Sequence, residues 1–226
     1  QAALGLQFQE PVPFNDEAIV YGGQGGDLKL SGDTKGTLTF QGQTPWGATL
    51  IKKFTFTGSL YTIDLEVSTG GAGTGTPPGL LLTTGGNYQI VTQDAVFEGL
   101  VALVGGKLIR ESGEELKEGK EMNGQIDWAG FGYTYFLFAM LPDSADLGTL
   151  GVKQAGPGLQ MNLGTQATGG SAPRIGYTIF IGPKDVDALK AMGKGLERSI
   201  DFGYFTLVAA PLLQVLRFSH RLTGSY

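Results

Sequence analysis

The residues that could serve as acids, bases or nucleophiles are few and scattered along the chain. The sequence has no Cys, and its single imidazole is His220, which lies beside Arg217 and Arg221. Disulfides, thiolate nucleophiles and zinc sites of the Cys/His type are therefore excluded. A serine triad would have to use His220, which we interpret instead as a partly exposed histidine of a C-terminal helix. We predict no catalytic residue and no metal site.

Carboxylates occur in three groups, and turns or solvated surfaces account for each group. The groups are Asp185 with Asp187, Glu114 and Glu115 with Glu118, and Asp143 with Asp146 after Pro142. An acid–base pair needs two carboxyls that face one cleft in different environments, and the sequence indicates no such cleft. Phosphate-binding and dinucleotide-binding glycine motifs and the G-x-S-x-G elbow are also missing. We therefore predict no cofactor.

The elements that would have to position any functional residue are mainly β-strands. Apolar and polar residues alternate with period two, which is typical of strands with one buried face. The run 133–141 is apolar on both faces, which predicts a central strand of a packed sheet. The apolar members of the clearest alternating runs are Leu38 and Phe40; Phe54 and Phe56; Tyr61, Ile63, Leu65 and Val67; Leu159, Met161 and Leu163; and Ile175, Tyr177, Ile179 and Ile181.

Turn signals separate these runs, and helical patterns appear only near the C-terminus. Gly-rich pairs divide residues 28–181 into antiparallel hairpins, which predicts a sandwich or a barrel. Residues 70–79 are predicted to be a flexible loop, and the charged residues 111–120 a solvated loop or edge hairpin. Residues 183–192 begin with Pro and precede Gly193, which predicts a short helix. A second helix is expected over 205–222.

The composition limits the possible partners. The chain has 226 residues, a net charge of −5 and 38 Gly without a G-X-Y period. An acidic chain is a poor ligand for nucleic acid, so we exclude DNA and RNA as partners. No apolar stretch reaches the roughly 18 residues that a membrane span needs. The chain starts at Gln1 without a signal-type segment, so we expect a fragment or a processed product.

An ordered set of motifs in the second half of the chain resembles one family. It runs from Ile-Asp-Trp-Ala-Gly at 126–130 through an aromatic strand to Met-Leu-Pro at 140–142, and continues with Gly-Pro-Lys at 182–184 and Asp-Phe-Gly at 201–203. This set is similar to the large periplasmic domain of the YidC family of bacterial membrane protein insertases. Residues 120–226 carry most of the resemblance, and the first 35 residues match least. The motif residues are Trp128, Phe136, Pro142, Gly182, Pro183, Asp201 and Gly203.

The resemblance implies a fold, a location and partners. The implied fold is an all-β supersandwich of two large antiparallel sheets with short C-terminal α-helices. Residues 1–182 would form the sandwich, and residues 183–226 a helical segment that leads to a second transmembrane helix. The implied function is that of a noncatalytic domain on the periplasmic side of the bacterial inner membrane. Its partners would be accessory subunits of the Sec translocon and nascent membrane proteins.

The expected helix over 205–222 is strongly amphipathic. At about 100° per residue, its apolar side chains fall into two clusters beside a narrow polar stripe. We predict that one cluster packs on the domain and the other lies at the membrane–water interface. The residues assigned to this interface are Phe205, Pro211, Leu212, Leu213, Val215, Leu216, Arg217, Phe218 and Arg221.

Two other functions remain open from the sequence alone. The supersandwich resembles galactose-mutarotase-like folds, so a carbohydrate-binding protein is the alternative, although a single histidine argues against mutarotase chemistry. Trp46 lies in a loop and is expected to be exposed, where it could report sugar binding. An adhesin-like sandwich is a third interpretation, and it leaves the C-terminal helix without a purpose.

Overall fold

The chain folds into two packed antiparallel β-sheets with a small helical cap. The computed structural model describes residues 4–8, 14–70, 80–87, 98–113, 115–144, 147–156, 158–165 and 174–200. Within these ranges the only α-helix is α1 (Val186–Met192), and the short 3₁₀ turns are η1 (Asp16–Ala18) and η2 (Leu196–Ser199). The predicted all-β class is therefore confirmed, with the α-helix after residue 182.

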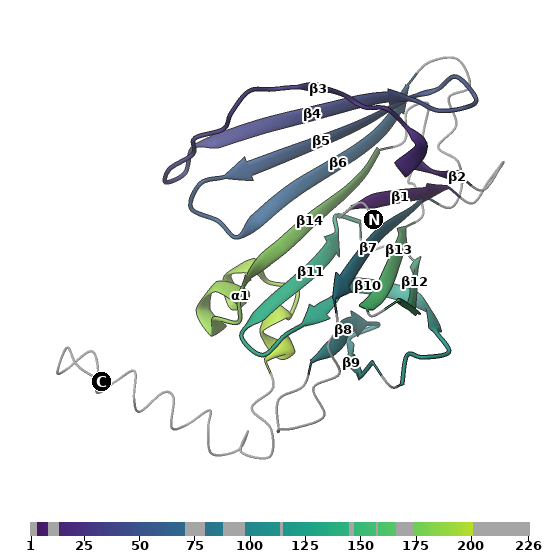
Figure 1. Cartoon of the computed structure of the whole chain (residues 1–226). Coiled ribbons are helices and arrows are strands. Elements are labelled where there is room, and N and C mark those ends of the chain that lie inside the picture. Colours follow the sequence, from purple (N-terminus) through teal and green to yellow (C-terminus); the bar gives the residue numbers. More distant parts are fainter. Residues whose placement is uncertain are drawn as a thin grey trace, which may run out of the picture.

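All the described strands belong to two sheets, which can be followed in Figure 1. The smaller sheet has the order β2-β1-β7-β13-β12-β10, and the larger sheet the order β9-β8-β10-β11-β14-β6-β5-β4-β3. The smaller sheet contains β1 (Gly5–Phe8), β2 (Phe14–Asn15), β7 (Leu80–Asn87), β12 (Leu147–Ala155) and β13 (Gly158–Thr165). The larger sheet contains β3 (Gly22–Gln24), β4 (Lys35–Gln43), β5 (Thr49–Thr57), β6 (Thr62–Gly70), β8 (Gly99–Val104), β9 (Lys107–Glu111), β11 (Phe136–Pro142) and β14 (Arg174–Pro183).

The long strand β10 (Lys120–Gly132) belongs to both sheets. Its first half pairs with β12, and its second half pairs with β8 and β11. A register shift between Ile126 and Trp128 marks the change of sheet. Irregularities of this kind bend a strand, which lets one chain segment turn the corner of a sandwich. Ile126 therefore packs between the sheets, while Trp128 lies on the outer face of the larger sheet.

The main core lies between the two sheets and follows the alternation in the sequence. Leu159, Met161 and Leu163 are all buried there, as their period-two pattern predicts. On β14 the pattern holds for three residues and then ends: Ile179 is fully buried, but Ile181 is 51% exposed. The inter-sheet core therefore stops between these two residues.

A second core lies on the outer face of the larger sheet, under the helical cap. Leu189 of α1 and Leu196 of η2 are fully buried there against Trp128 and Phe180. The aromatic run 133–141 supplies both cores from β11, with Met140 facing the sheets and its neighbours facing the cap. The prediction of a central strand is confirmed, although the strand begins only at Phe136.

Three local expectations are corrected by the structure. Pro183 ends β14 instead of opening the helix, and the N-cap is Asp185, which accepts hydrogen bonds from the backbone of Asp187 and Ala188. Trp46 is half-buried, because it packs edge-to-face on Phe14 with ring centroids 5.7 Å apart. The charged segment 111–120 is not simply solvated, since Leu116 within it is fully buried.

Candidate functional site

All residues of the predicted membrane-interface site lie outside the described residues. This applies to the whole expected helix over 205–222, to His220, and to Asp201 and Gly203 of the family motif. The amphipathic helix and the division of the chain at residue 182 therefore stay predictions. Five motif residues are described: Trp128, Phe136, Pro142, Gly182 and Pro183.

Two of these motif residues attach the helical cap to the larger sheet through one lysine. The indole N–H of Trp128 donates to the backbone carbonyl of Lys194 at 3.0 Å. The ammonium group of Lys194 donates in turn to the carbonyl of Pro142 at 2.7 Å. Lys194 adopts the left-handed conformation, with φ of 52°, in the turn between α1 and η2. The motif residues thus hold the cap, and Lys194 is a linking residue that the sequence analysis did not identify.

Arginines anchor the last described residues on the β8–β9 hairpin. The guanidinium of Arg110 donates to the carbonyls of Arg198 and Ile200, at 3.1 and 3.3 Å. Arg198 donates to the carbonyl of Gly106, in the turn between β8 and β9. The chain therefore leaves the described domain from a fixed position on the outer face of the larger sheet.

The other three motif residues meet at one end of the larger sheet. Phe136 and Pro183 are register partners at the ends of β11 and β14. Gly182 lies under Tyr61, and a Cβ at Gly182 would lie 2.8 Å from the Cβ of Tyr61. Any side chain at this position would therefore displace Tyr61, which explains the need for glycine.

A buried ion pair ties the N-terminal residues to the larger sheet. Asp16 is 2% exposed and forms a salt bridge with Lys52 of β5. Its carboxylate also accepts hydrogen bonds from the backbone of Leu6 at 2.8 Å and from the hydroxyl of Tyr21 at 2.7 Å. Lys52 donates to the carbonyl of Leu4 at 3.1 Å. Burial is the largest cause of a pKa of Tyr21 well above its usual value, and the hydrogen bond to Asp16 is the second. The hydroxyl of Tyr21 therefore remains a donor.

An open cleft of about 480 Å³ lies beside this ion pair. Its apolar part is formed by the half-buried rings of Phe40 and Phe54, which pack edge-to-face with centroids 5.9 Å apart. Ile19 and Tyr21 line another side of the cleft. Ile19 packs directly on the backbone of Gly42, because Gly42 has no side chain; a Cβ there would lie 2.2 Å from Ile19 Cγ2. The cleft therefore combines an apolar aromatic surface with a fixed polar edge.

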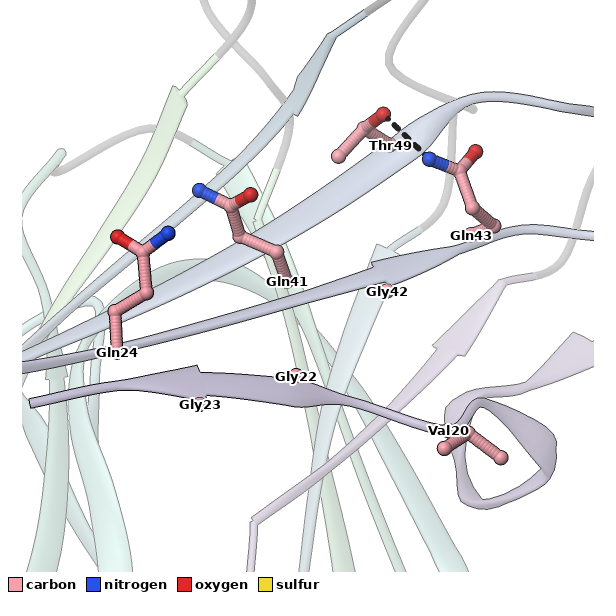
Figure 2. A pocket seen from close by; sticks show the side chains of 8 residues that line it. All are labelled: Val20, Gly22, Gly23, Gln24, Gln41, Gly42, Gln43 and Thr49. Carbon is pink, nitrogen blue, oxygen red and sulfur yellow. Dashed lines mark hydrogen bonds between the residues drawn. The ribbon is translucent and has the colours of Figure 1, made fainter.

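A second, polar hollow of about 590 Å³ lies where β3 and β4 form the free edge of the larger sheet. Figure 2 shows the amide side chains of Gln24, Gln41 and Gln43 on the same side of these strands. Gln43 donates to the hydroxyl of Thr49 at 3.0 Å. Gly22 and Gly23 add no side chains, so the backbone of β3 is exposed at this edge.

The ionisable residues that line the cleft are Asp16, Glu17, Tyr21 and Lys52, and the described residues that line the polar hollow carry no ionisable group. No group of His, Cys, Asp and Glu in the described ranges is arranged to hold a metal ion. Partial desolvation, with the nearby carboxylates Asp64 and Glu66, raises the pKa of Asp143, which is exposed and lies outside both hollows. In the same part of the chain, no helix is both long and apolar enough to cross a membrane.

Comparison with known sequences gives a match along almost the whole chain. The model of the YidC periplasmic domain matches residues 1–215. The membrane protein insertase YidC of Geotalea uraniireducens is 32% identical over 225 residues, which cover 93% of this chain and 42% of the relative. The insertase of the same name from Geobacter sulfurreducens is 29% identical, with 93% and 41% covered. The chain thus spans less than half the length of these relatives. The match starts at residue 1, so the first 35 residues, which resembled the pattern least, belong to it.

Comparison with solved structures identifies a similar architecture in sequences of low identity. An α-galactosidase from Lactobacillus brevis superposes with a TM-score of 0.52 at 10% identity, over 84% of this chain and 30% of that chain. The α-galactosidase AgaA from Geobacillus stearothermophilus gives 0.51 at 9% identity, over 81% and 30%. Identities this low show the fold alone, which is a sandwich of large antiparallel sheets.

Proposed function

Because this chain belongs to the YidC periplasmic domain family, we propose that it is the noncatalytic, periplasmic-side domain of a bacterial inner-membrane protein insertase. The family match over residues 1–215 carries this proposal. The relatives named as insertases are more than twice as long as this chain, so insertion itself belongs to the whole protein. The domain would assist insertion and folding of membrane proteins, alone or with accessory subunits of the Sec translocon. A carbohydrate-binding role is less well supported, since it depends on likeness of fold.

The cleft beside the Asp16–Lys52 ion pair suits an extended segment of a nascent membrane protein. Phe40 and Phe54 offer apolar surface that is already partly exposed, so a passing apolar side chain can be covered there. The free edge at β3 offers unpaired backbone groups to an extended chain. Neither surface has a deep pocket for one side chain, so we propose weak binding that tolerates many sequences.

Photo-crosslinking tests this proposal at the level of single residues. A crosslinking amino acid replaces Phe40 or Phe54 in the full-length insertase, and a stalled membrane-protein substrate is supplied. We expect adducts from both positions. Lys53 is the matched control, because it is exposed on the opposite face of the same strand as Phe54. If the control position crosslinks as strongly as the cleft positions, or if neither cleft position reacts, the cleft does not bind substrate.

The segment after Ile200 is proposed to lie at the membrane–water interface. Its support is the anchored position from which it starts, together with the two apolar clusters of residues 205–222. Replacing Leu213 and Leu216 by Asp is expected to impair insertion by the full-length protein while the β-sandwich stays folded. Insertion is measured as protease protection of a substrate in inverted vesicles, and folding by circular dichroism of the domain. Normal insertion by a folded, expressed double variant would remove this helix from the mechanism.

A further inference from the structure

Exposed apolar side chains gather at one end of the larger sheet. Seven large apolar residues in the described ranges are exposed, and five of them lie in the β5–β6 turn, in the β10–β11 turn or at the adjoining ends of β6, β11 and β14. We call these five residues the apolar tip. They are Leu60 (56% exposed), Tyr61 (55%), Tyr135 (75%), Phe136 (58%) and Ile181 (51%).

The backbone holds the apolar tip together across three neighbouring strands. The amide of Ile181 donates to the carbonyl of Tyr61 at 2.9 Å, which joins the end of β14 to the start of β6. The amide of Lys184 donates to the carbonyl of Tyr135 at 2.8 Å, and Phe136 faces Pro183 across the ladder. The five side chains are therefore presented by strand ends and tight turns, with their positions set by the sheet.

The core of the sandwich does not require apolar side chains at the apolar tip. Ile181 continues the core-facing pattern of β14 beyond the point where the core ends. None of the five side chains carries a charge, although the chain as a whole has a net charge of −5. Scattered exposed apolar residues are ordinary, but a gathered group on a fixed platform is typical of a contact surface.

We propose that the apolar tip contacts the lipid surface of the membrane, as a second contact besides the segment after residue 200. This proposal rests on the proposed location of the domain. Tyrosine is typical of membrane–water interfaces, because its ring is apolar and its hydroxyl remains hydrated. The tip also leads directly into α1, and Figure 1 shows the β10–β11 turn, α1 and the last described residues on the same side of the molecule.

Two contacts would fix the orientation of the domain. A single contact through the segment after Ile200 would leave the sandwich free to tilt about that point. The tip lies at the far end of β14 and β11 from the β8–β9 turn that holds Arg198, so the two contacts would be separated along the outer face. The cleft at Phe40 and Phe54 would then be held at a defined height above the bilayer.

The test uses the 226-residue chain with a tryptophan placed at the tip. Phe136→Trp is mixed with phosphatidylcholine vesicles, with and without brominated acyl chains. We expect a blue shift of the emission and quenching by the brominated lipid. Val20→Trp is the matched control, because Val20 is 92% exposed and lies away from the tip. Its fluorescence should not respond, and Trp46 and Trp128 are common to both variants.

A second arm measures partition onto vesicles by flotation. Tyr135→Asp with Phe136→Asp should lower the partition coefficient about tenfold or more, because two aromatic side chains no longer leave water. Val20→Asp with Gln24→Asp adds the same charge at exposed positions away from the tip and should leave the partition coefficient unchanged. Added salt should have little effect, since the tip is uncharged. Unfolding curves of both double variants show whether the sandwich is intact.

The outcomes separate this inference from the proposed function. If the protein floats with vesicles but the tryptophan at position 136 is not quenched, the segment after residue 200 carries the contact, and the tip proposal is overturned alone. If the tryptophan responds to an added apolar peptide and not to vesicles, the occupant is a protein chain, which also overturns it. If tip variants bind vesicles as the parent does, the lipid contact is absent.

Discussion

Replacing Asp16 by alanine is expected to lower the free energy of unfolding by about 3–5 kcal/mol. The substitution leaves the ammonium group of Lys52 buried without its counter-charge, at 8% residue exposure. It also removes the acceptor for the backbone N–H of Leu6 and the hydroxyl of Tyr21. Urea unfolding at neutral pH, followed by circular dichroism, measures the loss.

Two further variants decide whether the buried charge causes this loss. Adding Lys52→Met to Asp16→Ala should restore part of the stability, because methionine fills a similar volume without a charge. Glu66→Ala is the control, since it breaks the Arg174 pair, whose side chains are 71% and 42% exposed. An exposed pair contributes about 0–1 kcal/mol. If Asp16→Ala costs no more than Glu66→Ala, the ion pair does not hold the N-terminal residues in place.

Replacing Trp128 by alanine is expected to cost about 3–5 kcal/mol and to loosen the helical cap. The side chain is fully buried in the outer core, and its indole holds the carbonyl of Lys194. Hydrogen exchange should therefore accelerate in α1 and η2 more than in the strands between the sheets. The cap leads to the segment proposed for the membrane interface, so insertion by the full-length protein should fall even where the sandwich remains folded.

Conservative variants separate the packing of Trp128 from its hydrogen bond. Trp128→Phe keeps most of the apolar contact and removes only the N–H donor, so a loss of about 1–2 kcal/mol is expected. Trp46→Ala is the matched control, because it removes the same type of side chain far from the cap. Trp46 is half-buried against Phe14 near the N-terminal strands. It should leave exchange in α1 unchanged. Equal acceleration in α1 for both alanine variants would mean that Trp128 does not hold the cap.

The sequence predicted the class of fold because strand patterning is local information. Alternation in residues such as Leu159, Met161 and Leu163 states which face is buried, whatever the partner strand. The short helix after residue 182 was also visible, since Gly193 ends it. Its start was assigned wrongly to Pro183, because a proline at the end of a strand and one at the start of a helix have the same local preference.

The candidate site was less accessible to sequence reasoning. Asp16 and Lys52 are 36 positions apart, and Trp128 and Lys194 are 66 apart, so no spacing rule joins them. Lys194 appears in the sequence as one more surface lysine, and only its left-handed backbone and two hydrogen bonds identify its role. Ile181 is the opposite case, because its pattern predicts burial and the end of the inter-sheet core leaves it exposed.

The sequence by itself determined that this is an acidic, antiparallel β protein whose motifs match a periplasmic insertase domain. Composition, period-two alternation and ordered motifs depend only on the chain, and each is independent of which strands become neighbours. Only the tertiary structure decided that Asp16 meets Lys52, that β10 passes from one sheet to the other, and that five apolar side chains gather at one end. Such contacts depend on strand order and on where one sheet stops covering the other. Both are set by long-range strand pairing, which local patterns do not encode.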